Sequence, residues 1–198
     1  MYATYIKRFF DIIISAVFLP FLAILSGLIA ILIKIDDNGP VFYRANRLGQ
    51  HGKTFNMFKF RTMKADAPDI RNSDGSTFNK DDDPRLTKIG KILRNTSIDE
   101  LPQIINVFLG QMSFIGPRPD LPDQTSLYAD CMEKLDKRLS VKPGITGYSQ
   151  AYFRNAIDVK ERLEYDLFYI DNIGFFMDCR IVFRTGMCVF MKQGVYKN

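Results

Sequence analysis

The 198-residue sequence has few of the side chains that bind transition metals or form disulfides. It contains one histidine, His51, and three cysteines, Cys131, Cys179 and Cys188, none of which forms a CxxC pair. Zinc sites are built from Cys and His at short spacings, so no zinc site is expected. An odd number of cysteines indicates free thiols and a reducing compartment.

Charge is missing from the N-terminal part of the chain. No charged residue occurs from Ile12 to Ile33, a run of 22 residues, and a helix needs about 20 to cross the hydrocarbon core of a bilayer. The run is long for a signal peptide, and Lys34–Asp37 after it offers no small-x-small cleavage site. We therefore predict a membrane segment that is retained.

Pro20 divides this apolar run. Proline removes a backbone hydrogen bond and clashes with the preceding turn, so it kinks or breaks the helix. Alone, Pro20 favours a kinked single-pass anchor, because such helices are common in membranes. Cations flank the run on both sides, at Lys7, Arg8, Lys34, Arg44, Arg47 and Lys53. Positive charge at both ends is typical of two cytoplasmic ends, which a re-entrant hairpin has and a single span does not.

The remainder of the chain is dense in charge of both signs, and the net charge is +5 with a pI near 9.1. The length is enough for one domain, or for a small domain plus a membrane element. An apolar share of 46% excludes a disordered or fibrous protein. The excess of positive charge indicates nucleic acid, an anionic membrane surface or a phosphorylated substrate as partner, and composition leaves all three open.

Strand patterns precede helical patterns in this part of the chain. A β-prone stretch at Val41–Arg44 and a second at Thr54–Met63, with turn residues before each, predict a hairpin. The period of two places Lys59 and Arg61 on one face of its second strand. Helical or amphipathic patterns follow at 86–94, 99–110, 122–139 and 158–192, with stiff loops at 116–119 and 142–147.

The pentapeptide from Asp99 to Gln103 carries the strongest chemical signal. Pro102 has no amide hydrogen and fits only in a first helical turn, which places Asp99 and Glu100 at a helix N-terminus. There the helix dipole favours ionised carboxylates. An ionised Asp can act as a nucleophile, and a neighbouring carboxylate can hold a divalent cation that binds phosphate. An ordinary helix cap would use the same residues, so the pentapeptide alone does not decide.

Cations in stiff positions favour the catalytic interpretation. Arginine offers a planar fork that matches phosphate oxygens. Arg118 lies between Pro117 and Pro119, so its backbone has little freedom, which suits preorganised recognition. The set consists of Lys59, Arg61, Arg85, Arg94, Arg118 and Lys142. Beside an acidic pair and a membrane segment, these cations predict phosphate chemistry at a bilayer.

Several spaced motifs together resemble the bacterial sugar transferase family, the monotopic phosphoglycosyl transferases. They are Phe58–Met63, Asp83–Arg85 with Leu93-Arg94, Ser97–Gln103, Met112–Pro119 and Lys142–Gly147. The resemblance runs from about Lys7 to Phe190 and corresponds to the small members of the family. It implies a mainly helical α+β fold with a small β-hairpin. Residues 1–35 would form a re-entrant helix broken at Pro20, and residues 36–198 a catalytic domain lying on the cytoplasmic face of the bacterial inner membrane.

The resemblance also implies an activity. Asp99 would attack the β-phosphate of a UDP-sugar, an N-acetylated one by expectation, and release UMP. Polyprenyl phosphate would then attack the phosphosugar-aspartyl intermediate, giving a polyprenyl diphosphate sugar, the first membrane step of glycoconjugate assembly. Asp99 and Glu100 would hold Mg2+, or Glu100 would assist the acceptor. The partners would be UDP-sugar, polyprenyl phosphate and membrane lipid, without nucleic acid, and self-association is left open.

Phosphate-binding positions follow partly from the same resemblance. Lys59, Arg94 and Arg118 match basic positions of the family, and Arg154 stands in Phe153-Arg154-Asn155, where the family usually has Gly-Arg-Asn. With Arg61, Arg85 and Lys142 they complete the predicted set. The chain departs from the family pattern at three further places: Leu19 replaces a Ser, Gln111 replaces an acidic residue, and Tyr148-Ser149-Gln150 replaces Trp-Ala-Gln.

Two rival functions remain on the sequence alone. A non-catalytic, membrane-anchored module that binds acidic lipids or nucleic acid would explain the basic charge and the anchor, but not the acidic pair among the cations. A glycosyltransferase that moves only the sugar would release UDP instead of UMP. The identity of the released nucleotide separates these functions.

Overall fold

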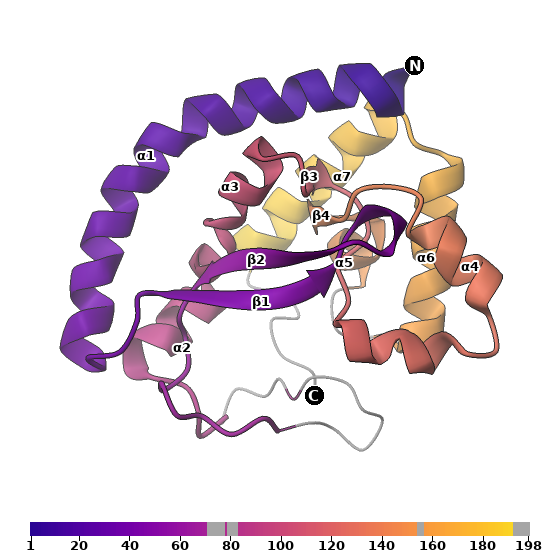
Figure 1. Ribbon diagram of the computed structural model, residues 1–198. Coiled ribbons are helices and arrows are strands. Elements are labelled where there is room, and N and C mark those ends of the chain that lie inside the picture. Colours follow the sequence, from indigo (N-terminus) through magenta and orange to yellow (C-terminus); the bar gives the residue numbers. More distant parts are fainter. Residues whose placement is uncertain (71–77, 79–82, 154–156, 192–198) are drawn as a thin grey trace.

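The N-terminal apolar run forms one long helix, α1, Lys7–Asp36, after a π-helical turn at Tyr2–Ile6. The computed structural model describes residues 1–70, 78, 83–153 and 157–191. In it α1 runs along the top of the molecule and bends down one side (Figure 1). Pro20 lies inside the helix, and an interior proline is a usual cause of such a bend. Among the described residues only Tyr2–Asp36 is long and apolar enough to cross a membrane, with a mean hydropathy of 2.7 over an 18-residue window.

Both ends of α1 are fastened to the rest of the described chain, which we call the body. Near the N-terminal end, Arg8 donates hydrogen bonds to the carbonyl oxygens of Val107 (2.6 Å) and Phe108 (2.9 Å). At the other end, the Asp36 carboxylate accepts from the backbone N–H of Ile89 at 2.8 Å. Between them the inner face of α1 packs in an apolar cluster of Leu22, Ile29, Ile33, Phe60, Leu93 and Ile104.

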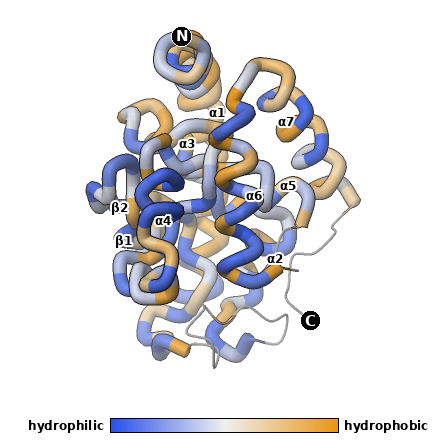
Figure 2. Tube along the Cα trace, turned by 90° about the vertical axis from the view of Figure 1, so that its right-hand side faces the viewer, coloured by the Kyte–Doolittle hydropathy of each residue, from blue (hydrophilic) through white to orange (hydrophobic). Residues whose placement is uncertain are grey.

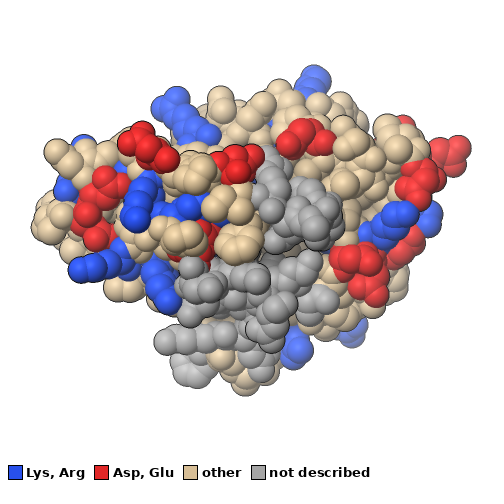
Figure 3. Space-filling model, turned by 90° about the horizontal axis from the view of Figure 1, so that it is seen from below, with Lys and Arg blue, Asp and Glu red and all other residues tan. Residues whose placement is uncertain are grey.

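The outer face of α1 is apolar and exposed. Its exposed side chains include Phe9, Phe10, Ile13, Val17, Phe18, Phe21, Ile24, Leu28, Ile31 and Ile35. Helix α7, Phe175–Phe190, adds Phe176 and Phe183, which are 79% and 72% exposed. Apolar stretches of α1 and α7 lie toward the same end of the molecule (Figure 2). The face seen from below carries acidic and basic side chains among other residues (Figure 3).

The predicted hairpin is confirmed. Strands β1, Phe42–Leu48, and β2, Thr54–Phe60, pair antiparallel with Tyr43 opposite Lys59. Residues directly opposite in an antiparallel pair share a face, so Tyr43 lies on the same face of the hairpin as Lys59. The second strand ends at Phe60, three residues earlier than predicted, although the N–H of Arg61 still donates to the carbonyl of Val41 at 2.9 Å.

Two short helices and a tight turn follow, close to the predicted ranges. Helix α2, Lys88–Asn95, starts at Thr87, whose hydroxyl accepts from the N–H of Gly90. A 3-10 turn at Ile98–Glu100 then leads into α3, Gln103–Phe108. The predicted helix near residue 99 is thus a 3-10 turn joined to a short α-helix.

The two stiff loops are brought together by a second small sheet. Strand β3, Ser113–Ile115, pairs parallel with β4, Gly144–Thr146. Gly116 and Gly144 sit so close that a Cβ on Gly144 would collide with the Gly116 backbone. Close packing of these glycines aligns the loop that carries Arg118 with the segment that follows Lys142.

The C-terminal half is helical. A 3-10 segment, Pro122–Tyr128, and α4, Met132–Arg138, divide the predicted helix at 122–139 in two. They are followed by α5, Tyr148–Tyr152, α6, Val159–Asp171, and α7, Phe175–Phe190. The predicted mainly helical α+β fold with a small hairpin is confirmed, whereas the re-entrant hairpin and a domain lying on the membrane stay predictions.

Candidate active site

The acidic pair lies in the 3-10 turn at Ile98–Glu100. Ser97, just before the turn, has φ 59° and ψ 15°, the left-handed region that a side chain rarely adopts. Such a conformation costs about 1–3 kcal/mol and is found mostly at functional sites. The strained backbone redirects the chain from α2 so that Asp99 and Glu100 face the hairpin. This sharp reversal has no signal in the sequence.

Glu100 is held by two cations. Its Oε1 accepts from Nζ of Lys59 at 2.6 Å and from a terminal nitrogen of Arg118 at 3.0 Å. Burial alone would raise the pKa of Glu100, but the charges of Lys59 and Arg118 outweigh it and hold that pKa well below its usual range. Glu100 is therefore ionised throughout the physiological pH range.

Asp99 is in the opposite situation. It is 7% exposed, and no other described side chain is within hydrogen-bonding distance of its carboxylate. Burial raises the pKa of Asp99 to about 6, with the opposing charge of Lys59 and the like charge of Glu100 as the next influences. A buried, weakly hydrogen-bonded carboxylate that still ionises near neutral pH is suited to nucleophilic attack.

Asn106 fixes Lys59 relative to Glu100. Its side chain is fully buried, and it accepts from the N–H of Phe58 at 2.9 Å and donates to the carbonyl of Asn56 at 2.8 Å. Asn106 therefore replaces a strand partner along β2 and attaches α3 to the hairpin. The sequence interpretation missed this residue, although an amide between apolar Ile105 and Val107 is the kind of signal that would have found it.

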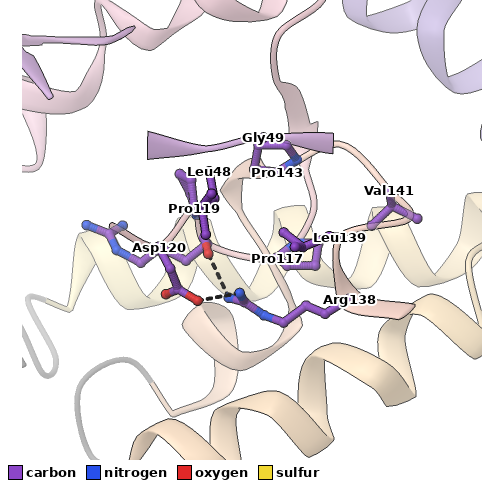
Figure 4. Close-up of a pocket in the computed structure, with 10 residues that line it drawn as sticks. Leu48, Gly49, Pro117, Pro119, Asp120, Arg138, Leu139, Val141 and Pro143 are labelled. Atoms are coloured by element: carbon purple, nitrogen blue, oxygen red, sulfur yellow. Dashed lines mark hydrogen bonds and ion pairs between the residues drawn. The ribbon is translucent and has the colours of Figure 1, made fainter. Parts of the chain in front are cut away.

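Arg118 is supported from behind by a buried ionic network. The carbonyl of Arg118 accepts from Arg138 at 2.7 Å, and Arg138 also bonds the carboxylates of Asp120 and Asp166. Arg138 and Asp120 point toward one another within a small pocket behind the loop (Figure 4). The pocket is lined by this ion pair and by Arg118 itself, so Asp120 and Arg138 support the Arg118 loop from behind. The network was also missed from sequence, since its members are scattered along the chain.

Arg94 and Arg85 lie on the α2 side of the site. A terminal nitrogen of Arg94 is 3.3 Å from the Thr62 hydroxyl, and its charge acts on Asp99. Arg85 is buried and pairs with Asp83 at 2.7 Å, and this pairing lowers the pKa of Asp83. The guanidinium fork of Arg85 is therefore already bound within the protein.

The other predicted phosphate-binding residues do not join this cluster. Arg61 bonds Asp37 at 2.8 Å, beyond the C-terminal end of α1. Lys142 lies with Arg8 beside Gly110, at the far end of α3. Arg154 lies outside the described residues. The structure thus gathers Lys59, Arg94 and Arg118 around the acidic pair, while a phosphate-binding role for the remaining cations stays a prediction.

The acidic pair offers oxygen atoms suited to Mg2+. Protein sites for this ion usually supply one or two carboxylates, with substrate phosphates and water completing the shell. Lys59 and Arg118 both contact Oε1 of Glu100, which leaves Oε2 and the Asp99 carboxylate as donors. Among the described residues no three His, Cys, Asp or Glu side chains gather as a metal site, so the phosphates would have to supply part of the coordination.

Comparison with known proteins shows the family of the chain. The model of the family described as bacterial sugar transferase matches residues 2–192. The chain belongs to this family. The Bacillus subtilis protein named uncharacterized sugar transferase EpsL is 40% identical over 193 residues, covering 98% of this chain and 91% of that protein.

Two longer relatives have names that state substrates. The UDP-glucose:undecaprenyl-phosphate glucose-1-phosphate transferase of Escherichia coli is 38% identical over 96% of this chain and 41% of its own length. The UDP-N-acetylgalactosamine-undecaprenyl-phosphate N-acetylgalactosaminephosphotransferase of Aeromonas hydrophila is 37% identical over 91% of this chain and 43% of its own length. The family assignment therefore covers all the residues that form the candidate active site.

Proposed function

We propose that this protein transfers a sugar 1-phosphate from a UDP-sugar to a polyprenyl phosphate. The observation that carries the proposal is the acidic pair itself. Asp99 is buried without a hydrogen-bonding partner among the described side chains, while the adjacent Glu100 is locked by Lys59 and Arg118. A helix cap needs neither this burial nor these cations. Relatives similar over more than nine-tenths of this chain are named for sugar-phosphate transfer to undecaprenyl phosphate.

The proposed chemistry has two displacements at one phosphorus atom. A carboxylate oxygen of Asp99 attacks the β-phosphorus of the UDP-sugar, the bond from that phosphorus to the bridging oxygen breaks, and UMP leaves with the bonding electrons. The sugar phosphate is then an acyl phosphate on Asp99. A phosphate oxygen of the polyprenyl acceptor attacks the same phosphorus, which regenerates the carboxylate and forms the diphosphate. Lys59 and Arg118 stand where they would stabilise negative charge on the phosphoryl oxygens.

Mg2+ is part of this proposal. Asp99 and Glu100 would hold the ion, which when bound neutralises phosphate charge and orients the diphosphate. The soft ligands that would favour other metals are absent from the described part of the site. Full turnover in excess chelator would contradict this assignment.

We further propose that α1 enters and leaves the bilayer on the same, cytoplasmic side. Arg8 near one end and Asp36 at the other are both bonded to the body, and a helix that spanned the bilayer would place its ends on opposite sides. The outward apolar side chains of α1 and α7 would then face lipid. Labelling of a Tyr2→Cys variant in intact cells tests this, because modification from outside would mean a single span.

The sugar remains the least constrained part of the proposal. The names of the two substrate-defined relatives specify glucose and N-acetylgalactosamine at nearly equal identity, so similarity does not select one. Our expectation of an N-acetylated sugar is therefore tested by a screen of UDP-sugars. The screen measures UMP release with polyprenyl phosphate present, and release of UDP would instead indicate a transferase that moves only the sugar.

The decisive experiment traps the intermediate. The wild-type protein, incubated with a UDP-sugar labelled in the sugar and quenched in acid, should retain label, whereas Asp99→Asn should retain none. Glu100→Gln is the matched control, since it changes the neighbouring carboxylate. Label lost with Glu100→Gln but kept with Asp99→Asn would reverse the two roles. Near wild-type turnover in both variants would reduce the pair to a helix cap.

A further inference from the structure

Arg47 is a cation of the hairpin to which the function above assigns no role. It lies in β1, two residues after Ala45 and directly opposite Phe55. Alternate strand residues share a face, and directly opposite residues do so as well. Arg47 therefore lies on the same side of the hairpin as Lys59, the side chain that bonds Glu100.

The end of β1 is tied to the loop that carries Arg118. The N–H of Leu48 donates to the carbonyl of Asp120 at 2.9 Å. Arg47 precedes Leu48, and Arg118 lies two residues before Asp120, so the two arginines flank this bond from adjacent segments. Their charges interact: burial and then the charge of Arg118 lower the pKa of Arg47 to about 10, against the opposing charges of Asp120 and Glu100.

The side chain of Arg47 makes no hydrogen bond or ion pair with the described residues, although the charges of Asp120 and Glu100 act on it. Its Nε is enclosed without a hydrogen bond, and no described acceptor lies within bonding distance of its terminal nitrogens. Arg61 and Arg162 also have an unbonded Nε, but their terminal nitrogens bond carboxylates. Arg184 has an unbonded Nε as well, and its guanidinium lies over the ring of Tyr152. Arg47 is therefore unusual among the described arginines close to the site.

The carboxylates nearest Arg47 are already bound. Glu100 accepts from Lys59 and Arg118, and the Asp120 carboxylate accepts from arginines of the buried network behind the loop. An enclosed charged donor without an acceptor is costly. The cost is removed when an anionic ligand supplies the oxygen atoms, and two adjacent guanidinium groups suit phosphate.

We propose that Arg47 and Arg118 together bind one phosphate group of a substrate, with Arg47 as a second phosphate-binding residue contributed by the hairpin. The inference rests on the proposed function. The phosphate has two sources, the diphosphate of the nucleotide sugar and the phosphate of the polyprenyl acceptor. Both present the same oxygen chemistry to the arginines, so the experiment must separate them.

Arg44 provides a matched control for Arg47. It is the same residue type, three positions earlier in the same strand and on the other face, where its guanidinium lies 5.4 Å from the ring centroid of Phe58. Arg44→Gln and Arg47→Gln remove the same charge from opposite faces of β1. Arg47→Lys keeps the charge but loses the fork.

The experiment uses the full chain in lipid nanodiscs. Binding of UDP is measured by calorimetry, and KM for polyprenyl phosphate is measured by UMP release, for wild type and the three variants. Arg47→Gln should weaken UDP binding or raise the acceptor KM by about tenfold or more, the usual loss for a hydrogen bond to a charged group. Arg47→Lys should recover part of the loss, and Arg44→Gln should match wild type.

The two readouts identify the source of the phosphate. Weaker UDP binding assigns the phosphate to the nucleotide sugar, and a raised acceptor KM alone assigns it to the lipid. Arg47→Gln with an unchanged circular dichroism spectrum, UDP affinity and acceptor KM would overturn the inference while leaving the proposed function intact. A wild-type protein that neither binds UDP nor releases UMP from any UDP-sugar would overturn both.

Discussion

Two clusters of buried charge meet at Arg118 and behave differently. The side chain of Arg118 belongs to the first, around Asp99 and Glu100. The backbone carbonyl of Arg118 accepts a hydrogen bond from Arg138 and therefore belongs to the second cluster, which also contains Asp120. In the second cluster burial alone would raise the pKa of Asp120, but the charges of the neighbouring arginines outweigh it and lower that pKa. In the first cluster the pKa of one carboxylate is raised and that of the other is lowered.

The difference separates a cluster that stabilises from one that is available for chemistry. In the network of Asp120, Arg138 and Asp166, every carboxylate is paired and hydrogen-bonded, and the tyrosine and serine hydroxyls around it are used as well. The acidic pair leaves Asp99 buried and unbonded by described side chains. Polar groups that folding leaves unsatisfied are a feature of sites completed by a ligand.

The largest effect should come from Asp99→Asn. Asn has nearly the same size and caps a helix as well as Asp, but it cannot attack phosphorus, so turnover should fall by at least about a thousandfold. UMP release measures this. Glu100→Gln should be impaired less in forming the labelled intermediate, and equal retention of turnover in the two variants would remove the distinction between the carboxylates.

Asp99→Asn should also stabilise the protein near neutral pH. Because burial raises the pKa of Asp99 to about 6, the folded state binds its proton more tightly than the unfolded state. The contribution of Asp99 to the stability of the folded state is therefore fully present below about pH 4 and is lost as the pH rises through about 6. Asp99→Asn should gain roughly 1–3 kcal/mol at pH 8. The gain should shrink toward pH 4, and thermal unfolding followed by circular dichroism measures both.

In the cluster of Asp120, Arg138 and Asp166, the substitution Arg138→Met should strongly destabilise the folded protein. Removing the shared cation leaves Asp120 and Asp166 buried without their main partner, which costs about 3–5 kcal/mol. Lys134→Gln, in the same helix α4, removes a cation from an exposed pair with Glu164 and should change stability by less than about 1 kcal/mol. Equal melting temperatures for the two variants would mean that the buried network does not support the Arg118 loop.

The pH dependence should report Asp99 and not Glu100. Attack requires ionised Asp99, so kcat/KM should rise about tenfold per pH unit below about 6 and level off above it. Glu100, whose pKa is held low by Lys59 and Arg118, should add no step in this range. A rate that is flat from pH 5 to 8 would place the raised pKa elsewhere.

The smallest effect should come from Ser97. Because φ is 59° at this position, Ser97→Gly should change stability by no more than about 1 kcal/mol and preserve turnover. Ser97→Val should destabilise the protein by more than Ser97→Gly and slow UMP release, since a β-branched side chain fits this region poorly. Equal melting temperatures and rates for Gly and Val would mean that the left-handed turn does not position the acidic pair.

Local patterns predicted the elements of the fold well. The hairpin follows from alternation, α2 and α3 follow from helical spacing, and α1 follows from an uncharged run. Local signals failed where long-range contacts decide. The predicted helix at 122–139 is split, because Tyr128 is pinned to Asp120 at 2.8 Å and the chain reverses before Met132.

The candidate site was predicted in part for the same reason. Asp99, Glu100, Lys59 and Arg118 occur in motifs that the sequence displays, and they meet in space. Arg61 and Lys142 look equivalent to Lys59 in sequence, yet Arg61 is bound by Asp37, and Lys142 lies beside Gly110 with Arg8. No local pattern states which carboxylate a cation will meet.

The sequence by itself determined the family, the apolar helix and the acidic pair at a helical turn, because these depend on composition and on residues near one another. Only the tertiary structure decided that Asp99 is buried while Glu100 is locked by cations from two other segments. It also decided that Asn106 and Arg138 support those cations. Burial and ion pairing depend on which distant segments pack together, and that packing sets each pKa.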